Sequence, residues 1–301
     1  MLKIKKKKMA EKIFLLAILA YPLIHFAIFY IGVNFNSLLL AFQKYDLNYN
    51  LQWNGFQNFV DVIRSLKGDS LLGTSVWNSL RVFFWTTVIG FPLNMLFSYY
   101  LYKKIMGHQV IRFIIMLPSI ISGMVMTLLF MKFIGGALPR LFSLMGLKLP
   151  DLLNDPDWSF NTMLFYTLWT GFTSSLILYP NAMNGISKEI TESAQLDGVN
   201  TLKELWYIIM PLIYPTITTF FVTGVAGMLA FSGPLFAFYY YNAPPEVYTS
   251  GYYLFVKVMA AEGITGYPFT AAAGILFTLI SAPLTILTKF LMERFGPQSD
   301  Y

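Results

Sequence analysis

The sequence predicts an all-α membrane protein with six transmembrane helices, and three observations lead to this fold class. Of the 301 residues, 56% are hydrophobic and 12% are charged, whereas soluble domains carry about 25% charged residues. The mean hydropathy is +0.58. Six long stretches contain no Asp, Glu, Lys or Arg, at 13–43, 82–102, 113–131, 158–187, 205–245 and 263–288. So little charge leaves too little polar surface for a water-soluble protein of this size.

Each charge-free stretch reaches or nearly reaches the length that crosses a bilayer. A helix rises about 1.5 Å per residue, so about 20 apolar residues span a hydrocarbon core about 30 Å thick. Backbone polar groups must be paired within the segment when they lie in lipid, so these stretches are expected to be helical. We therefore predict spans at 13–33, 77–102, 112–134, 161–182, 214–238 and 269–290, which form one transmembrane domain over 13–290.

The basic residues predict the orientation of the chain. Cytoplasmic segments of membrane proteins carry an excess of Lys and Arg, and residues 1–12 contain Lys3, Lys5, Lys6, Lys7, Lys8 and Lys12. Residues 1–12, the loop 183–213 and the tail 291–301 are therefore expected in the cytoplasm, with the N- and C-termini inside. The first apolar run is longer than a signal-peptide core of about 7–15 residues, so it is expected to be an uncleaved anchor. The lysines are either an orientation signal held on anionic lipid or a site for a specific partner.

The composition excludes several kinds of chemistry. The chain has no Cys and only two His, His25 and His108, which disfavours disulfides, thiolate nucleophiles and histidine metal sites. No Gly-x-x-x-x-Gly-Lys-[Ser/Thr] loop is present to hold nucleotide phosphates. The net charge of +6 is concentrated near the N-terminus, so nucleic acid is not an expected partner. We expect no catalytic residue, metal or cofactor in this chain.

The loop 183–213 carries more local order than a connector needs. Ser187 is predicted to cap a short helix, which Asp197-Gly198 ends because glycine supplies the left-handed position after the last turn. A second helix is predicted from Thr201, with Glu204 completing a capping box. Its apolar residues at i, i+3, i+4 and i+7 predict one face of a helix, namely Leu202, Leu205, Trp206 and Ile209.

Two short capped helices of this kind have two interpretations. They can form a rigid projection that docks on a partner protein, or an interfacial pair that lies flat on the membrane. The residues alone do not decide between these interpretations.

The same loop resembles the EAA motif of ABC importer permeases. The resemblance rests on Glu192-Ser193-Ala194, Asp197-Gly198, Ile208 and Met210-Pro211, at the spacing of that motif and between the fourth and fifth predicted spans. Ser193, Leu205 and Met210 depart from the usual alanine, aromatic residue and leucine, but they keep the small or apolar character of those positions.

The resemblance extends over nearly the whole chain. Tyr21-Pro22, Trp77-Asn78-Ser79-Leu80 and Gly266-Tyr267-Pro268 resemble the carbohydrate-uptake permeases of the maltose type, which belong to the binding-protein-dependent transport inner membrane components. The chain looks most like the first permease of Gram-positive oligosaccharide importers. The resemblance implies the type I ABC importer permease fold in a bacterial plasma membrane.

The resemblance also implies partners and roles. A second permease, a dimer of ATPase subunits that binds ATP and Mg²⁺, an extracellular solute-binding lipoprotein and a carbohydrate substrate would complete the system. In such importers the EAA loop sits in a groove of one ATPase subunit. Glu192 would then be the charged contact, Ala194 and Gly198 would permit close approach, and Asp197 would fix the turn.

Candidates for the substrate pathway follow from the polar and small residues of two spans. Trp169-Thr170-Gly171 resembles a Trp-x-Gly segment of the maltose permease, which places Gly171 and Ser174 on sugar-contacting positions. Further candidates in the fifth span are Leu229, Ala230, Ser232 and Gly233. The alternative is that the small residues mediate helix packing and that Trp169 belongs to an interfacial aromatic belt.

Three other functions stay open from the residues. A secondary transporter would call for ionisable residues inside the spans and often for inverted repeats, and the charge-free runs argue against it. A sensor or scaffold would not need the loop 183–213. An ABC permease could also carry a non-sugar solute, such as a glycerophosphodiester or a peptide.

Overall fold

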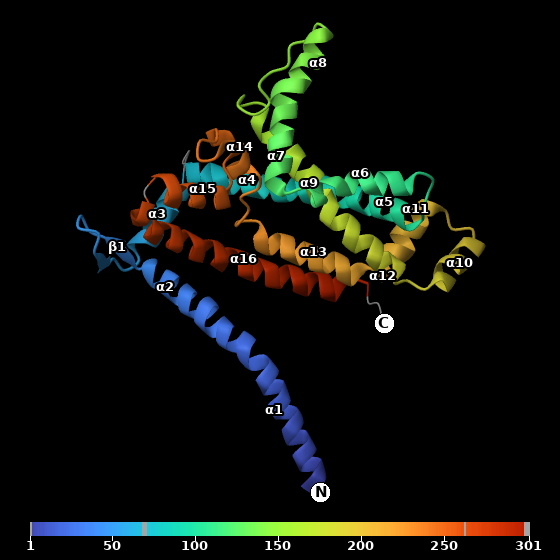
Figure 1. Cartoon of the computed structure of the whole chain (residues 1–301), viewed down its shortest axis with the longest axis horizontal. Coiled ribbons are helices and arrows are strands. Elements are labelled where there is room, and N and C mark those ends of the chain that lie inside the picture. The colour runs from blue at the N-terminus through green and yellow to red at the C-terminus, as the bar shows by residue number, and fades with distance from the viewer. Residues whose placement is uncertain (1, 68–70, 262, 298–301) are drawn as a thin grey trace. The chain divides into compact units, whose positions relative to one another are not determined.

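The computed structural model describes residues 2–67, 71–261 and 263–297. The chain divides into two compact units. The first consists of residues 1–64 and 257–276, and the second of residues 65–256 and 277–301. Both units are built mainly from helices (Figure 1).

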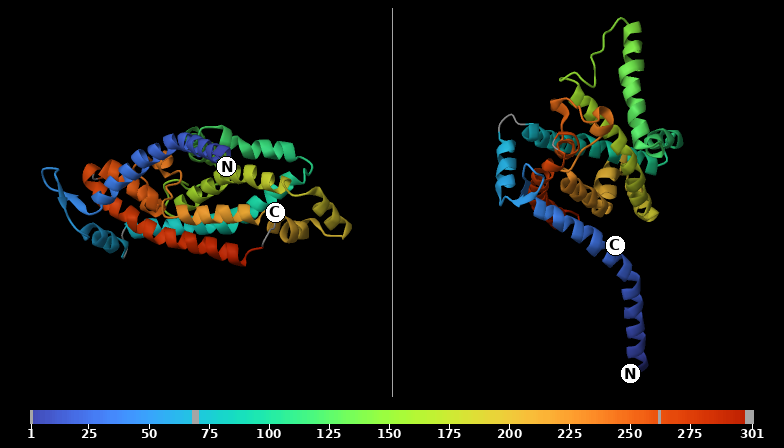
Figure 2. Two further views of the ribbon diagram at one scale, coloured as in Figure 1. Left: turned by 90° about the horizontal axis from the view of Figure 1, so that it is seen from below. Right: turned by 60° about the vertical axis from the view of Figure 1, so that its left-hand side comes forward.

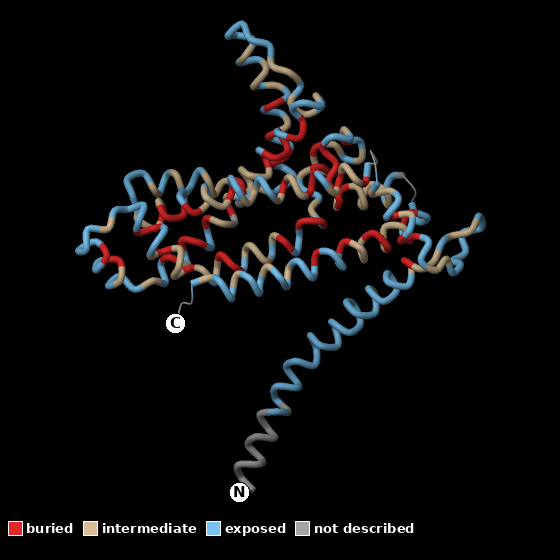
Figure 3. The backbone as a smooth tube through the Cα atoms, turned by 180° about the vertical axis from the view of Figure 1, so that it is seen from behind, coloured by how far each residue is buried: buried red, intermediate tan, exposed pale blue. Residues whose placement is uncertain are grey.

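The first unit begins with one long apolar helix. Its parts are α1 (Leu2–His25), a π-helical segment (Phe26–Gly32) and α2 (Val33–Leu40), which follow one another without a break. The apolar stretch Phe14–Leu40 is long enough to cross a membrane, and none of its most apolar part is buried. Figure 3 shows this helix exposed along its described length. The span predicted at 13–33 is therefore confirmed as helix, although the apolar helix continues to Leu40.

A short hairpin in the first unit was not predicted. Strand β1 (Gln43–Tyr45) pairs antiparallel with β2 (Leu51–Trp53), with Gln43 opposite Trp53. The Asp46 carboxylate closes the turn by accepting hydrogen bonds from the backbone N–H groups of Asn48 and Asn50, both at 2.8 Å. These bonds, chiefly that of Asn50, hold the pKa of Asp46 below its usual value. The charged side chain at the turn thus belongs to a small β element in a chain expected to be wholly helical.

Helix α3 (Gln57–Leu66) packs against this hairpin. The Asn58 side-chain amide donates to the carbonyl oxygens of Ala41 and Gln43, at 2.8 and 2.7 Å. The Phe42 ring stacks on Trp53 with 5.7 Å between ring centroids. The rest of the first unit comprises a π-helical segment (Lys257–Ala261), a 3-10 turn (Gly263–Gly266) and the first part of α16 (Tyr267–Phe295).

In chain order the helices and turns of the second unit are α4 (Leu71–Trp85), a π-helical segment (Thr86–Gly90), α5 (Phe91–Tyr102), α6 (His108–Ile120), α7 (Gly123–Lys132), a π-helical segment (Phe133–Ala137), α8 (Leu138–Leu144), α9 (Ser159–Asn184), α10 (Lys188–Leu196), α11 (Thr201–Glu204), a π-helical segment (Leu205–Ile209), α12 (Met210–Leu212), α13 (Tyr214–Gly227), α14 (Leu235–Tyr239), a 3-10 turn (Pro245–Val247) and α15 (Ser250–Val256). The C-terminal part of α16 also belongs to this unit. Of these, α4, α5, α6, α9 and α13 run alongside one another as a bundle, whereas α7 and α8 project from it (Figure 1 and Figure 2).

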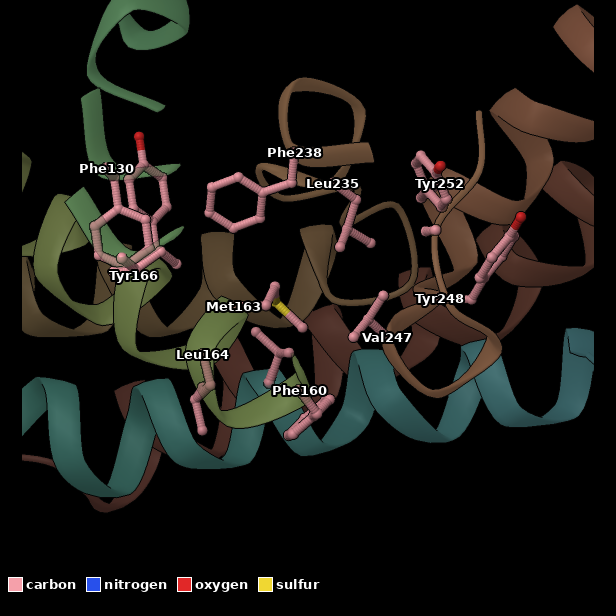
Figure 4. Packing of buried hydrophobic residues seen from close by; sticks show 13 residues of the cluster. Phe130, Phe160, Met163, Leu164, Tyr166, Leu235, Phe238, Val247, Tyr248 and Tyr252 are labelled. Carbon is pink, nitrogen blue, oxygen red and sulfur yellow. The ribbon is translucent and has the colours of Figure 1, made fainter. Parts of the chain in front are cut away.

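Two buried clusters hold the second unit together. At one end, the side chains come from α7, α9, α14 and residues 247–252, and include Phe130, Met163, Tyr166 and Phe238 (Figure 4). At the other end, α5, α9 and the segment from α11 to α13 contribute Met95, Tyr99, Tyr179, Met183, Leu205, Ile209, Ile213 and Ile217. Helix α5 packs along α9 between these clusters.

The span predicted at 112–134 is wrong, because two separate helices occupy this stretch. Helix α6 ends at Ile120, Ile121 and Ser122 are extended, and α7 starts at Gly123. Pro118 removes a backbone donor within the last turn of α6, and glycine is a poor helix interior residue. The long apolar helix is instead Gly123–Leu144, and it projects from the bundle of the second unit (Figure 1).

The helix predicted at 214–238 also ends early. Helix α13 stops at Gly227, residues 228–234 are turns and irregular backbone, and α14 is a separate short helix. The break coincides with Ser232-Gly233-Pro234, which combines a left-handed glycine at φ 56° with a residue that cannot donate a backbone hydrogen bond.

Four helices in the described residues are long and apolar enough to cross a membrane: Phe14–Leu40, Leu71–Tyr102, Gly123–Leu144 and Gly263–Phe295. A fifth is possible if Thr201–Leu212 and Tyr214–Gly227, which meet at 74°, form one bent span. Helix α9 is absent from this group although it has 26 residues. Its sequence explains this, because Asn161, Thr162, Thr167, Thr170, Thr173 and Ser175 lower its hydropathy.

Candidate functional site

The first candidate site is the polar loop, a name used below for residues 183–213. Its helix α10 is capped as predicted, because the Ser187 hydroxyl accepts a hydrogen bond from the Glu189 backbone N–H at 3.3 Å. At the other end, the N–H of Val199 donates to Ala194 and the N–H of Gly198 donates to Gln195, both at 3.1 Å. This is a Schellman ending, and Gly198 has the left-handed φ of 76° that it requires.

The predicted capping box at Thr201 is wrong. The cap of α11 is Asn200, whose side-chain oxygen accepts from the Lys203 backbone N–H at 2.9 Å. The helix is thus capped one residue earlier than predicted, so Glu204 is too far along the helix to reach back to the cap. Its carboxylate instead pairs with Lys103 at the end of α5, with 2.6 Å between Nζ and Oε1.

Of the four residues predicted to form the apolar face of the second helix, two are buried and two are exposed. Leu205 and Ile209 are fully buried in the second cluster, whereas Leu202 and Trp206 are 59% and 47% exposed. The segment Leu205–Ile209 is π-helical, which changes the angular spacing assumed for an α-helix. Within this helix, Leu205 and Ile209 therefore attach the polar loop to the bundle, and Leu202 and Trp206 remain exposed apolar side chains.

The EAA-like residues are arranged in two groups. Glu192, Ser193, Asp197 and Gly198 are exposed, while Ala194 is buried and Ile208 and Pro211 are partly buried. Within the described residues, the carboxylates of Glu192 and Asp197 have no hydrogen-bond or ion-pair partner. Ala194 is only 7% exposed, so in this chain its side chain contributes little to the outer surface of the loop.

The second candidate site is a cavity of about 390 Å³ in the second unit. It lies where α6, α7 and α9 meet the turn before α14, and its lining is Pro118, Gly123, Met126, Thr127, Tyr166, Thr167, Thr170, Phe231, Gly233, Pro234 and Ala237. Small-molecule sites have volumes of roughly 300–1,000 Å³ and combine apolar walls with a few polar groups, and this cavity has both properties.

The hydroxyl groups in this cavity have defined hydrogen-bond roles. Thr127 donates its single proton to the Gly123 carbonyl at 2.8 Å, so the Tyr166 hydroxyl must be the donor in the 2.8 Å bond between Tyr166 and Thr127. Thr167 and Thr170 also donate to backbone carbonyls of α9. The threonine oxygens keep free lone pairs, so the cavity can accept hydrogen bonds from a ligand rich in hydroxyl groups.

Among the predicted pathway residues whose side chains the structure describes, only Gly233 lines this cavity. Trp169 lies beside the first buried cluster, 6.0 Å from the Phe130 and Tyr166 rings. Gly171, Ala230 and Ser232 are exposed and Leu229 is buried. Ser174 lies in α9, but its side chain is outside the described part of the structure.

Sequence reasoning missed the cavity residues Thr127, Tyr166, Thr167 and Phe231. Thr127 and Tyr166 belong to different helices, so no local pattern joins them. A signal did exist for α9, because Thr167 and Thr170 are polar residues three apart in a predicted span, and such residues tend to face a cavity or another helix.

A buried hydrogen-bond network holds the turn that forms one wall of the cavity. The Asn78 amide donates to the carbonyls of Glu246 and Tyr248, at 2.8 and 3.0 Å. Ser250 bonds to Ser79 at 2.8 Å and donates to the Leu229 carbonyl at 2.7 Å. The network thus joins α4 to the residues just before Phe231.

Gly251 completes this contact. Its N–H donates to the Phe231 carbonyl at 3.2 Å, and a Cβ at this position would collide with the Ala230 carbonyl. The backbone therefore approaches the 228–234 turn at a distance that only glycine permits.

The loop between α8 and α9 is fixed to α14. The Asp151 carboxylate accepts from the side-chain amide of Asn154 and from the N–H groups of Leu153 and Asn154, at 2.8–3.1 Å. These bonds, that of the Asn154 amide first, lower the pKa of Asp151. The Tyr239 hydroxyl donates to the Leu153 carbonyl at 2.6 Å. Residues before and after α9 are thereby held together.

A larger cavity of about 670 Å³ lies between α13 and the C-terminal part of α16. Its lining includes Thr218, Thr219, Lys289 and Glu293, and it contains none of the predicted pathway residues. Lys289 and Glu293 form an exposed ion pair at 3.7 Å. We place the candidate pathway at the smaller cavity because hydroxyl groups converge there from two helices.

Apolar helices, a capped helical loop at one end and a hydroxyl-lined cavity define the class, which is the pathway-forming subunit of a membrane transporter. A family model for the binding-protein-dependent transport system inner membrane component matches residues 86–300. Because this match covers more than half of the chain, the chain belongs to that family. It is a permease component of a binding-protein-dependent ABC importer in a bacterial plasma membrane.

Individual relatives agree with the family. The chain is 25% identical, over 75% of its length and 78% of the relative, to the multiple sugar-binding transport system permease protein MsmF of Streptococcus mutans. It is 21% identical, over 90% of its length and 85% of the relative, to the arabinooligosaccharides transport system permease protein AraP of Bacillus subtilis. A crystal structure of a bacterial ABC transporter involved in alginate import superposes with a TM-score of 0.79 at 21% identity, covering 97% of this chain and 99% of the other.

Proposed function

We propose that this permease imports a carbohydrate, specifically an oligosaccharide. The names of the two relatives support a sugar or an oligosaccharide as the class of substrate. The cavity supports it independently, because its threonine oxygens accept hydrogen bonds while Phe231 and Tyr166 supply apolar rings. One chain contributes half of the pathway, and a second permease contributes the other half.

The polar loop is the docking site for an ATPase subunit that binds ATP and Mg²⁺. The observation that carries this proposal is the combination of a rigid, doubly capped loop with unpartnered carboxylates on its exterior. Glu192 is the charged contact, and Gly198 gives the left-handed turn. Leu205 and Ile209 connect the loop to the bundle, so that closure of the ATPase dimer rocks the two permeases between inward-open and outward-open states.

Six spans with both termini in the cytoplasm complete the proposal. Helix α9 is the fourth span despite its polar residues, because a helix that lines a pathway is not surrounded by lipid. An extracellular lipoprotein delivers the sugar to the outer side. A Gram-positive source fits the organisms of the two relatives.

Uptake in a strain that lacks this chain tests both parts of the proposal. Radiolabelled arabino-, galacto- and malto-oligosaccharides are offered to the deletion strain carrying the wild-type chain, Glu192→Lys or the control Glu293→Lys. The wild type and the control should restore uptake of at least one oligosaccharide, because Glu293 is exposed and its ion pair with Lys289 contributes little. Glu192→Lys should abolish uptake and copurification of the ATPase, while the amount of permease in the membrane stays normal.

Each part can fail separately. Uptake of a glycerophosphodiester or a peptide, with no uptake of any oligosaccharide, would contradict the carbohydrate assignment. Normal uptake and ATPase binding by Glu192→Lys would contradict the docking role of the polar loop.

A further inference from the structure

One ion pair in the second unit is buried. Lys103 Nζ lies 2.6 Å from Glu204 Oε1, and the two side chains are 21% and 3% exposed. The other ion pairs between described residues, Arg64–Asp61 and Lys289–Glu293, are largely solvent-exposed at 3.8 and 3.7 Å. A buried carboxylate requires its partner, because an isolated charge is strongly disfavoured away from water.

The pair joins two elements that are distant in the sequence. Lys103 is the residue that follows α5, and Glu204 is the last residue of α11 in the polar loop. The rings of Tyr99 and Tyr102 lie 5.7 and 5.9 Å from the ammonium group, at the distance of a cation–π contact. The ion pair is therefore held in place from several sides.

This region is one of two places where the polar loop joins the bundle, and the other is the end of α9. The side-chain hydrogen bonds that α10 and its flanks make within the described residues are local, such as those of Ser187 and Thr191. The connection to the bundle comes directly after Glu204, where Leu205 and Ile209 are buried. A movement of α10 therefore reaches the bundle through the end of α9 on one side and through α11 and its contacts on the other.

The chain bends sharply beyond this point. The segment Thr201–Leu212 meets α13 at 74°, and it contains the π-helical turn Leu205–Ile209. The ion pair fixes α11, on the near side of this bend, to the end of α5. Helix α5 packs along α9, which lines the hydroxyl-rich cavity.

We propose that Lys103 and Glu204 are positioning residues that transmit movement of the polar loop into α5. This inference rests on the proposed docking of the polar loop to an ATPase. The apolar contacts of Leu205 and Ile209 keep the loop attached, and the ion pair makes the end of α5 move with the loop. Without the charges, the ATPase still binds and hydrolyses ATP, but less of the movement reaches the pathway.

Two spin labels on the assembled transporter test this movement directly. Gln195→Cys in α10 and Met106→Cys in the α5–α6 connection are both exposed and lie outside the residues proposed to contact the ATPase, and the chain has no cysteine of its own. The distance between labels is measured without nucleotide and with ATP and vanadate. In the wild-type pair the distance should stay constant between the two states, because the two segments move together.

Four variants separate transmission from stability. Glu204→Gln, and the double variant Lys103→Gln with Glu204→Gln, should show a nucleotide-dependent change in this distance. Their oligosaccharide uptake per ATP hydrolysed should fall by about tenfold, a typical loss of coupling between sites. The exchange Lys103→Glu with Glu204→Lys should restore both readouts, and the exposed control Glu293→Gln should leave both unchanged.

Glu204→Gln leaves the Lys103 ammonium without its partner and can prevent assembly for that reason. The double glutamine variant removes both charges, so it still tests the proposal in that case. A constant label distance and wild-type uptake per ATP in the double variant would overturn the proposal. A proportional loss of ATPase activity and uptake would also overturn it, because that pattern indicates a purely structural pair. Failure of the docking proposal is recognised separately, since Glu192→Lys would then retain the ATPase.

Discussion

At the scale of single residues, several polar side chains are placed by tertiary contacts rather than by their local sequence. Asn78 is buried in α4, and its side-chain amide donates hydrogen bonds to two backbone carbonyls of the 244–250 segment. Glu204 is buried beside Lys103. Both residues lie next to apolar segments, where a buried polar group without a partner is destabilising. Asn78 therefore joins α4 to the segment 244–250, and Glu204 joins α11 to the end of α5.

Asn78→Ala should destabilise the second unit by about 1–3 kcal/mol, because two buried carbonyls lose their donors. The control is Asn161→Ala on the exposed start of α9, where the amide makes only a 3.4 Å bond to the Asp157 carbonyl. Thermal unfolding of the detergent-purified chain measures the difference. Equal melting temperatures for the two variants would show that the Asn78 bonds do not hold this region.

At the scale of elements, the polar loop is stiff because both of its helices have specific ends. The Ser187 and Asn200 caps start α10 and α11, and the Schellman ending stops α10. Such ends satisfy backbone groups that would otherwise be free. The docking on an ATPase subunit that we propose calls for such defined helix ends.

Gly198→Val should weaken the end of α10, because a β-branched residue in a left-handed conformation costs about 1–2 kcal/mol. Hydrogen exchange of the Val199 amide, which bonds to Ala194, should become faster, and uptake should fall. Gly198→Asn is the matched control, since asparagine tolerates this conformation and nothing lies within 4 Å of a Cβ at this position. Loss of uptake in Gly198→Asn with normal exchange would instead show that the ATPase needs the space.

At the scale of the whole molecule, membership of the family establishes that the chain is an ABC importer permease. Which segments lie on each side of the membrane is part of our proposal. The proposal puts residues 103–107 and the polar loop in the cytoplasm. It puts the β1–β2 hairpin and the end of α8 outside. These four regions contain exposed residues that can be labelled: Leu47, Met106, Leu144 and Ser193.

Single cysteines at these positions should report the orientation without background, because the chain contains no cysteine. A membrane-impermeant maleimide should label Leu47→Cys and Leu144→Cys in intact cells. In cells that make this chain without the ATPase, which would otherwise cover Ser193, it should label Met106→Cys and Ser193→Cys only after the membrane is permeabilised. Labelling of Ser193→Cys in intact cells would contradict the proposed orientation, and protection of Leu144→Cys would place the end of α8 elsewhere.

The sequence by itself determined the membrane character, most helical segments, the cap at Ser187 and the end of α10 at Gly198, because these depend on composition and short-range hydrogen bonding. The breaks after α6 and α13 and the turn of the β1–β2 hairpin also have local causes in Pro118, Gly233-Pro234 and Asp46, although the length of the charge-free runs did not reveal them. The tertiary structure decided that Glu204 pairs with Lys103 and that Thr127 and Tyr166 share a cavity with Thr170. These features depend on contacts between residues far apart in the chain, and local periodicity contains no information about which distant partner will satisfy a buried polar group.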